Sequence, residues 1–258
     1  MVKVLYIDVD YRLTGTSSLG KDDNAIKEMF GFKPLHIKTG DNFARLMEKI
    51  GTMKEIETEL GFNSIYVLNE PYNEADFIVL DSISGLQTFI KKEIRGSRKM
   101  FTQQDWGMLA DRMQDYLIKF ACCEKNIIIT CHTKFDKDSE LGRRIEIPAL
   151  SGQTGETIGQ YLDIILYSTI ETHPQTKRRS YKWQVIPDER RNARGLPYMT
   201  QEAMKYGGLV DQDFRKLFEL IRKDTNSPVK IGIFGQYGTG KTYSLRTLVN
   251  LEDLQNKG

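Results

Sequence analysis

Short apolar runs alternate with amphipathic segments throughout the sequence. The runs at residues 2–9 (VKVLYIDV), 75–81 (ADFIVLD), 126–131 (NIIITC) and 162–168 (LDIILYS) are rich in β-branched residues. Continuous apolar runs of this length are typical of strands that are buried on both faces of a parallel sheet. Residues 180–186 (SYKWQVI) alternate between polar and apolar side chains instead, which predicts one strand of a hairpin.

Helical spacing appears between these runs. It predicts a covering helix over residues 43–60, with an apolar stripe formed by Phe43, Leu46, Met47, Ile50, Met53, Ile56 and Leu60. It also predicts a short helix ending at Phe30, a helix over 105–123 that packs on the sheet and a terminal helix over 211–221. Residues 135–145 are charged and 148–161 are rich in glycine, so we expect a loop followed by a flexible binding loop. Strands that alternate with helices predict an α/β fold with a mostly parallel central sheet.

One glycine-rich stretch near the end of the sequence carries the clearest chemical signal. Gly235, Gly240, Lys241 and Thr242 satisfy the phosphate-loop pattern G-x-x-x-x-G-K-[ST]. An apolar run ends at Phe234 and helix formers follow the loop, which is the context that the pattern requires. Glycines let successive N–H groups converge on an anion, and the following helix adds partial positive charge. The stretch predicts a nucleotide-phosphate site; a glycine-rich turn is the alternative.

The predicted nucleotide site comprises Gly235, Gln236, Tyr237, Gly238, Thr239, Gly240, Lys241, Thr242 and Tyr243. Lys241 is expected to reach the terminal phosphates, and the Thr242 hydroxyl is expected to hold Mg²⁺. A phosphate loop normally begins its domain, yet here only residues 243–258 follow it. The other strands of the sheet must therefore come from the sequence before the loop.

Three earlier strands end in residues that suit the same site. Asp81 follows four apolar residues, as does a Walker B carboxylate that binds the water shell of Mg²⁺. Asp10 is either a carboxylate that orients the attacking water or a turn aspartate bonded to its own backbone. Thr130 and His132 end the third strand, where a polar residue can sense the terminal phosphate. A loop histidine with ordinary partners is an equal alternative for His132.

Basic clusters provide two further candidate surfaces. Basic residues interspersed with aromatic rings can track single-stranded nucleic acid, and such residues gather at Lys91, Lys92, Arg95, Arg98, Lys99, Phe101 and Trp106. A solvated helix face is the alternative. Residues 188–196 contain a second cluster, in which Arg191 or Arg194 is a candidate to stabilise charge on the nucleotide of a neighbouring subunit. Surface arginines in ion pairs are the alternative there.

Charge and cysteine content narrow the class of protein. The formal net charge is +2, so net charge alone indicates no polyanionic partner. The three cysteines form no C-x-x-C pair, which favours buried thiols in a reducing compartment. The sequence shows neither a signal-peptide pattern nor an apolar run long enough to span a bilayer. We therefore expect a cytoplasmic protein with no membrane partner.

Read from residue 229 to the end and then onward from residue 2, the sequence resembles the RecA-like ATPase core. The order becomes strand, phosphate loop, helix, strand ending in Asp10, Walker B strand, and strand ending in Thr130 and His132. The chain is most similar to small phage nucleotide-binding ATPases with a RecA core, some of which act in single-strand annealing. The resemblance rests on residues 235–242, 77–81, 127–132, 102–106 (TQQDW) and 162–167 (LDIILY).

The resemblance implies a three-layer P-loop fold, ATP with Mg²⁺, single-stranded DNA and a homo-oligomer, in a phage-infected bacterial host cell. It implies that Lys241 and Thr242 contact phosphate and Mg²⁺ and that Asp81 contacts the metal. It also implies that Thr130 and His132 lie on the strand that senses the terminal phosphate. Asp10 stands where RecA-like proteins usually have a catalytic glutamate. Because aspartate is one methylene shorter, slow hydrolysis or a different position of the attacking water follows.

We interpret the order of segments as a circular permutation, natural or artificial, of one ATPase domain over residues 1–258. Residues 1–223 run from the second strand to the former C-terminal helix, 224–230 (DTNSPVK) join the former ends, and 231–258 carry the loop with its strand and helix. Termini of compact domains often lie close together, so Gly258 should lie near Met1. A tandem array cut within a repeat is the alternative, and it predicts that residues 243–258 fray.

These features favour a Mg²⁺-dependent ATPase that binds single-stranded DNA and couples nucleotide state to assembly. A nucleotide-gated DNA-binding or scaffold module with little turnover is the alternative, which Asp10 in place of glutamate slightly favours. A GTPase is disfavoured because the sequence contains no complete N-K-x-D guanine-reading motif.

Overall fold

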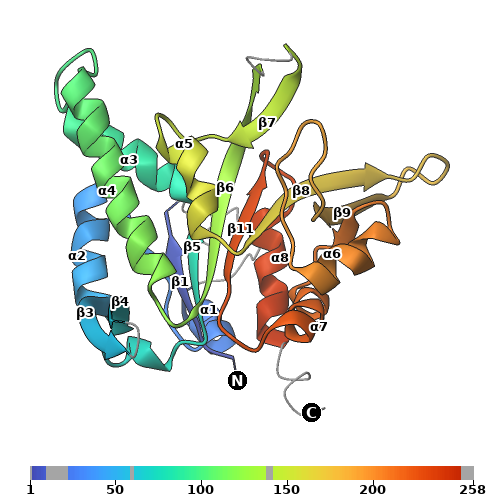
Figure 1. Ribbon diagram of the computed structural model, residues 1–258, viewed down its shortest axis with the longest axis horizontal. Coiled ribbons are helices and arrows are strands. Elements are labelled where there is room, and N and C mark those ends of the chain that lie inside the picture. Colours follow the sequence, from blue (N-terminus) through green and yellow to red (C-terminus); the bar gives the residue numbers. More distant parts are fainter. Residues whose placement is uncertain (1, 10–22, 59–60, 138–141, 251–258) are drawn as a thin grey trace.

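A computed structural model describes residues 2–9, 23–58, 61–137 and 142–250 of the chain, with side chains described up to residue 248. Helices cover both faces of a mostly parallel sheet, which gives the three layers seen in Figure 1. The predicted α/β class with a mostly parallel central sheet is confirmed.

Nine strands of the described residues form this sheet, in the order β10-β9-β8-β11-β6-β5-β1-β2, with β7 paired to β6. In chain order they are β1 (Val4–Asp8), β2 (Leu35–His36), β5 (Phe77–Asp81), β6 (Asn126–Lys137), β7 (Arg144–Pro148), β8 (Ile164–Thr172), β9 (Arg179–Gln184), β10 (Leu209–Asp211) and β11 (Lys230–Gly235). In the sheet, the adjacent strands β8, β11, β6, β5, β1 and β2 pair in parallel. Strands β7, β9 and β10 pair antiparallel with their neighbours. Every residue of β1, β5 and β11 is buried, as their apolar runs predict.

The last strand of the chain lies in the middle of the sheet. β11 pairs in parallel with β6 on one side and with β8 on the other, and Figure 1 shows it between these two strands. The carboxyl ends of β1, β5, β6 and β11 consequently meet at one edge. Asp8 is level with Asp81 there, and His132 is level with Gly235.

Two groups of helices bury the apolar faces of the sheet. One face packs against α2 (Gly40–Ile50), α3 (Ile83–Arg95) and α4 (Gln103–Ala121). The other packs against α1 (Asp23–Phe30), α6 (Pro197–Met204), α7 (Phe214–Asp224), α8 (Lys241–Ser244) and the 3-10 helix η3 (Leu245–Asn250). The remaining helical segments are short connections, namely η1 (Tyr72–Glu74), α5 (Thr154–Thr157) and η2 (Ile158–Tyr161).

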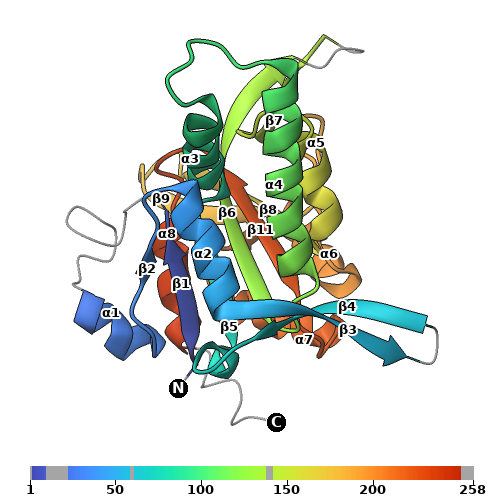
Figure 2. The ribbon, with the colours of Figure 1, turned by 90° about the vertical axis from the view of Figure 1, so that its left-hand side faces the viewer.

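The predicted helix over residues 43–60 is wrong beyond Ile50. Helix α2 ends there, and the chain continues as a hairpin of β3 (Gly51–Thr58) and β4 (Gly61–Leu68), which projects from the body in Figure 2. Met53 and Ile56, expected in the core, are 38% and 36% exposed. The two lie three residues apart, which matches one face of a helix, whereas a strand exposed on both faces requires no particular apolar spacing. The sequence pattern therefore favours the helix over the hairpin that the structure contains.

Gly51 lets the hairpin pack closely where α2 ends. A Cβ at this position would come within 2.7 Å of the Tyr66 ring and of the Val67 carbonyl oxygen. The Tyr66 hydroxyl in turn donates a hydrogen bond to the carbonyl of Met47 in α2. Contacts between the base of the hairpin and the helix thus fix the point at which the helix stops.

Two predicted loops are also partly wrong. Strand β6 continues to Lys137 and pairs with β7, so residues 135–137 and 144–145 of the expected charged loop are strands instead. Within the expected flexible loop over 148–161, residues 154–161 are helical. The part before them is held by Gln87, which donates to the Ser151 carbonyl over 3.2 Å and accepts from the Ser151 N–H over 2.7 Å.

No helix of the described residues has both the length and the apolar character needed to cross a membrane. Cys122, Cys123 and Cys131 form no disulfide, and burial raises the pKa of the Cys123 thiol to about 11. This thiol therefore stays protonated and unreactive near neutral pH.

Replacing Phe43 with Ala is expected to lower the free energy of unfolding by about 3–5 kcal/mol, because the ring is fully buried and packs edge-on against Tyr116. Phe62→Ala, on the exposed part of β4, is the matched control and should change stability by less than about 0.5 kcal/mol. Urea denaturation followed by circular dichroism measures both. Equal losses would contradict the assignment of core and hairpin.

Candidate nucleotide-binding site

Strand β11 delivers the glycine-rich loop to the carboxyl edge of the sheet. Gly238 and Gly240 have φ angles of 78° and 87°, which glycine adopts without the cost that a side chain adds. Helix α8 begins immediately afterwards, at Lys241. Within the loop, the Thr239 hydroxyl donates to the Gln236 carbonyl over 2.8 Å. The loop therefore has the strand, turn and helix that a phosphate loop requires.

Asp81 lies at the centre of the site. It ends β5 with 1% of its surface exposed, and its carboxylate accepts hydrogen bonds from hydroxyls of three other elements. Tyr6 of β1 and Thr242 of α8 donate to Oδ2 over 2.6 and 2.7 Å, and Thr130 of β6 donates to Oδ1. These hydrogen bonds replace the hydration that a buried carboxylate loses. They also bring the predicted metal-binding residues Asp81 and Thr242 into contact.

Lys241 lies between its own loop and β6. Its ammonium donates to the carbonyls of Gly235 and Gln236 over 2.6 and 2.8 Å, and it lies 3.5 Å from Nδ1 of His132. The His132 ring stacks on Tyr237, with ring centroids 3.8 Å apart. The structure thus brings the predicted sensor histidine to the predicted phosphate-binding lysine.

The oxygen atoms of Asp81 and Thr242 fit a Mg²⁺ site. A carboxylate and a hydroxyl are ligands of the type that Mg²⁺ prefers, and they lie 2.7 Å apart. The described residues contain no cluster of three histidine, cysteine or acidic side chains that would hold a metal ion unaided. Mg²⁺ often completes its shell with waters and substrate phosphates, so this small set of protein ligands is compatible with a nucleotide-dependent site.

Asp10, the predicted water-orienting residue, lies outside the described residues. Asp8 ends β1 level with Asp81 and is fully buried. His36 lies between two carboxylates, with Nδ1 3.1 Å from Asp8 Oδ2 and Nε2 3.2 Å from Asp23 Oδ1. The described part of the first strand therefore brings one acidic residue, Asp8, to the edge of the site, and the role of Asp10 stays a prediction.

A family model described as an AAA domain matches residues 2–188. The chain belongs to this AAA domain family. Membership indicates a P-loop ATPase of the AAA type, a class of proteins that bind and hydrolyse nucleotides. Searches of curated proteins and of solved structures found no match.

The sequence pattern does not reveal several residues of this site. Tyr6 belongs to an apolar strand, yet its hydroxyl contacts Asp81. Ser84 is buried in α3 and accepts a hydrogen bond from the His132 N–H over 3.1 Å. Gln212 donates to the Thr239 carbonyl over 3.0 Å. None lies in a motif, and their roles depend on contacts between distant parts of the sequence.

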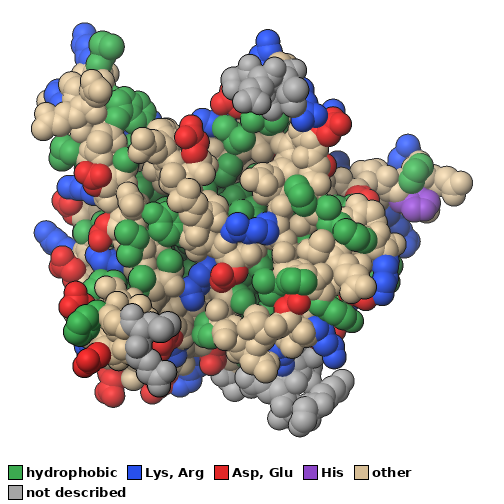
Figure 3. All heavy atoms as spheres, viewed as in Figure 1, with side chains coloured by type: hydrophobic (Ala, Val, Ile, Leu, Met, Phe, Trp, Pro, Cys, Tyr) green, Lys and Arg blue, Asp and Glu red, His purple; other side chains and the backbone are tan. Residues whose placement is uncertain are grey.

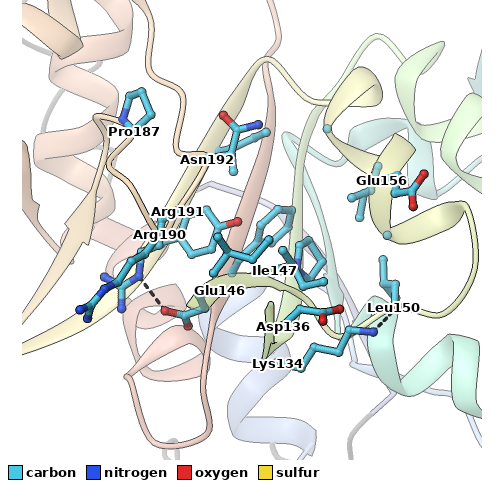
Figure 4. Close-up of a pocket in the computed structure, with 18 of the residues that line it drawn as sticks. Lys134, Asp136, Glu146, Ile147, Leu150, Glu156, Pro187, Arg190, Arg191 and Asn192 are labelled. Carbon is cyan, nitrogen blue, oxygen red and sulfur yellow. Dashed lines mark hydrogen bonds and ion pairs between the residues drawn. The ribbon is translucent and has the colours of Figure 1, made fainter. Parts of the chain in front are cut away.

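The two candidate arginines have partners within the chain. Arg191 donates from Nε to the buried Glu146 over 2.7 Å, the contact drawn as a dashed line in Figure 4. Arg194 donates to the carbonyls of Gly159 and Leu162. These contacts match the ion-pair alternative for Arg191. A role for either arginine at the nucleotide of a neighbouring subunit stays a prediction.

A cavity of about 670 Å³ is lined in part by Arg191 and lies on the sheet face opposite α8. Its lining includes apolar side chains of the sheet, among them Ile165, Tyr167 and Phe234. Charged side chains of both signs surround them, including Lys134, Asp136, Glu156 and Arg190 (Figure 4). Phe234 directly precedes Gly235 in β11, so the cavity and the phosphate loop share one strand.

Proposed function

We propose that this AAA domain hydrolyses ATP with Mg²⁺. The observation that carries the proposal is the 2.7 Å hydrogen bond between the Thr242 hydroxyl and the Asp81 carboxylate, two residues 161 positions apart. A phosphate-loop hydroxyl and a Walker B carboxylate are the protein groups that hold Mg²⁺ in P-loop nucleotide hydrolases. The sequence contains no complete guanine-reading N-K-x-D motif, which favours ATP over GTP.

The protein's own groups bind and orient the phosphates in this proposal. Backbone N–H groups of the loop and of the start of α8 cradle the phosphate oxygens. Lys241 turns from the carbonyls of Gly235 and Gln236 to the terminal phosphate and stabilises the charge that develops there. Thr130 and His132 contact the same phosphate from β6, and Asp10 orients the attacking water. Mg²⁺, when bound, neutralises charge on the phosphate oxygens.

Replacing Lys241 with Ala is expected to lower the rate of phosphate release from Mg·ATP by at least about 100-fold, because it removes a charge that stabilises the transition state. Lys54→Ala, an exposed lysine on the remote strand β3, is the control and should leave the rate unchanged. A rate retained in Lys241→Ala would contradict the proposal. Tight ATP binding by the wild type without phosphate release would instead favour the nucleotide-gated module.

We propose that single-stranded DNA binds at the corner formed by the α3–α4 turn. Met100 and Trp106 are 80% and 38% exposed there. The Lys91 ammonium lies 4.8 Å from the centre of the Trp106 ring. Figure 3 shows basic and hydrophobic side chains together at the upper left, over this turn. Such surfaces stack bases on rings and pair phosphates with cations, and the resemblance to phage ATPases that act in annealing supports the same partner.

One helix connects this corner to the nucleotide site. Ser84, Gln87 and Lys91 follow one another at helical spacing along α3. Ser84 accepts from the His132 N–H, Gln87 holds the Ser151 backbone, and Lys91 lies over Trp106. A shift of His132 with nucleotide state would therefore reach the proposed DNA surface through a single rigid element.

The affinity for a labelled single-stranded oligonucleotide should fall as salt is added, measured by fluorescence anisotropy. Lys92→Ala combined with Lys99→Ala, both exposed, should weaken binding and reduce the slope of log affinity against log salt by about one per lysine. Lys54→Ala combined with Lys223→Ala, exposed on other surfaces, is the matched control. An affinity that does not respond to salt would contradict the proposed surface.

We infer that the chain is a circular permutant of a P-loop domain. Two observations support this. The last strand lies between β6 and β8 in the sheet, and the AAA match ends at residue 188, before the loop. The alternative, a repeat cut from a tandem array, predicts a frayed end, whereas Leu245 and Leu248 are fully buried. The expected proximity of Gly258 to Met1 lies outside the described residues.

Restoring the ordinary order tests this inference. A chain that begins at residue 229, joins Gly258 to Met1 through a short glycine–serine linker and ends at Pro228 should fold and bind Mg·ATP. Opening the chain inside α4, between Asp111 and Arg112, with the same linker is the control and should prevent folding. Loss of folding in the restored order, with the original order folding normally, would argue against permutation.

A further inference from the structure

The phosphate loop is bordered by two different walls. On the side of β6 and β5, His132 lies 3.5 Å from the Lys241 ammonium, and Asp81 lies 2.7 Å from the Thr242 hydroxyl. On the other side β8 pairs with β11, and β9 and β10 continue the sheet. In the proposed ATPase, the lysine and the metal-binding pair place the terminal phosphates at the first wall. The nucleoside, at the other end of the triphosphate, must then lie towards the second.

Tyr181 stands at this second wall, directly beside the loop. It precedes Trp183 by two positions on β9, and the Trp183 ring packs on the same core as α7 and η3. Side chains two positions apart on a strand share a face, so Tyr181 lies on the face that carries the loop helix. A Cβ on Gly240 would come within 2.9 Å of the Tyr181 ring, yet the tyrosine is 41% exposed.

Gln212 ties the ring and the loop together. Its side-chain Nε2 donates to the Thr239 carbonyl over 3.0 Å and to the Lys182 carbonyl over 2.9 Å. Its backbone N–H donates to the Tyr181 carbonyl over 3.3 Å. Asp211, the preceding residue, forms ion pairs with Lys182 and Lys216. The fold itself therefore holds an exposed aromatic ring beside the phosphate loop, which lowers the entropy lost when a ligand binds.

We propose that Tyr181 is the stacking platform for the base of the bound nucleotide, an inference that rests on the proposed ATPase function. An aromatic side chain offers a flat apolar face to a base, and every base has a complementary face. The ring therefore adds affinity for nucleosides in general, while the loop supplies affinity for phosphates. This separation makes the role of Tyr181 measurable with ligands that have a base and with ligands that lack one.

The test compares Mg·ATP with Mg·tripolyphosphate, both titrated calorimetrically into the full chain. Tyr181→Ala should weaken ATP binding about tenfold, a loss within the range for one base–aromatic stack, and should leave tripolyphosphate binding unchanged. Tyr181→Phe keeps the ring and should bind both ligands as the wild type does. Tyr181→Leu fills the space beside Gly240 without an aromatic face and should behave like the alanine variant. Circular dichroism checks that each variant is folded.

Two results would overturn this inference while leaving the proposed function intact. Equal losses of ATP and tripolyphosphate would mean that Tyr181 supports the loop rather than the base. Unchanged ATP affinity in both Tyr181→Ala and Tyr181→Leu would exclude contact with the base. In either case Lys241→Ala should still lose both ligands. Failure of the wild type to bind either ligand would overturn the proposed function, and the inference with it.

Discussion

The carboxylate of Asp81 contacts residues from both early and late parts of the sequence. Hydroxyls from Tyr6, Thr130 and Thr242 donate to it, so β1, β5, β6 and α8 meet at one buried group. A buried charge that loses its hydrogen-bond partners is strongly destabilising, so the four elements are held in one relative arrangement. The register of the sheet follows from the same requirement, because strand ends that slipped past one another would separate these hydroxyls from the carboxylate.

The position of the phosphate loop depends on this arrangement. Strand β11 contributes six buried residues between β6 and β8, and the loop emerges at the edge where Asp81 and His132 already lie. Lys241 can therefore approach a histidine that is 109 positions earlier in the sequence. Neither wall of the site comes from the segment that carries the motif. The AAA match over residues 2–188 and the loop at the end of the chain describe two parts of one site.

Strand β6 connects the candidate site to the cavity on the sheet face opposite α8. Its first half lies in the central sheet and carries Thr130 and His132, and its second half pairs with β7 beyond the sheet. Glu146 on β7 then fixes Arg191 at the large cavity. Helix α3 provides a second connection, since Ser84 contacts the backbone of His132 and Gln87 holds Ser151. The candidate site is thus linked to two surfaces by regular elements rather than by loops.

Local patterns predicted the elements whose side chains are buried on both faces or fixed by backbone geometry. The apolar runs of β1, β5 and β11 and the glycines of the phosphate loop belong to this class, because burial and positive φ angles restrict residue type at each position. The hairpin at residues 51–68 does not, because most of its side chains face solvent and its apolar spacing also matches a helix.

The sequence alone determined an α/β protein with a phosphate loop and an acid-ended strand. Tertiary structure decided that the hydroxyls of Thr242 and Tyr6 contact the Asp81 carboxylate. It also decided that Tyr181 and Gln212 lie beside the phosphate loop. The physical reason is that a motif reports the conformation of its own backbone. A contact between residues far apart in the sequence depends instead on how strands pair and which faces they bury.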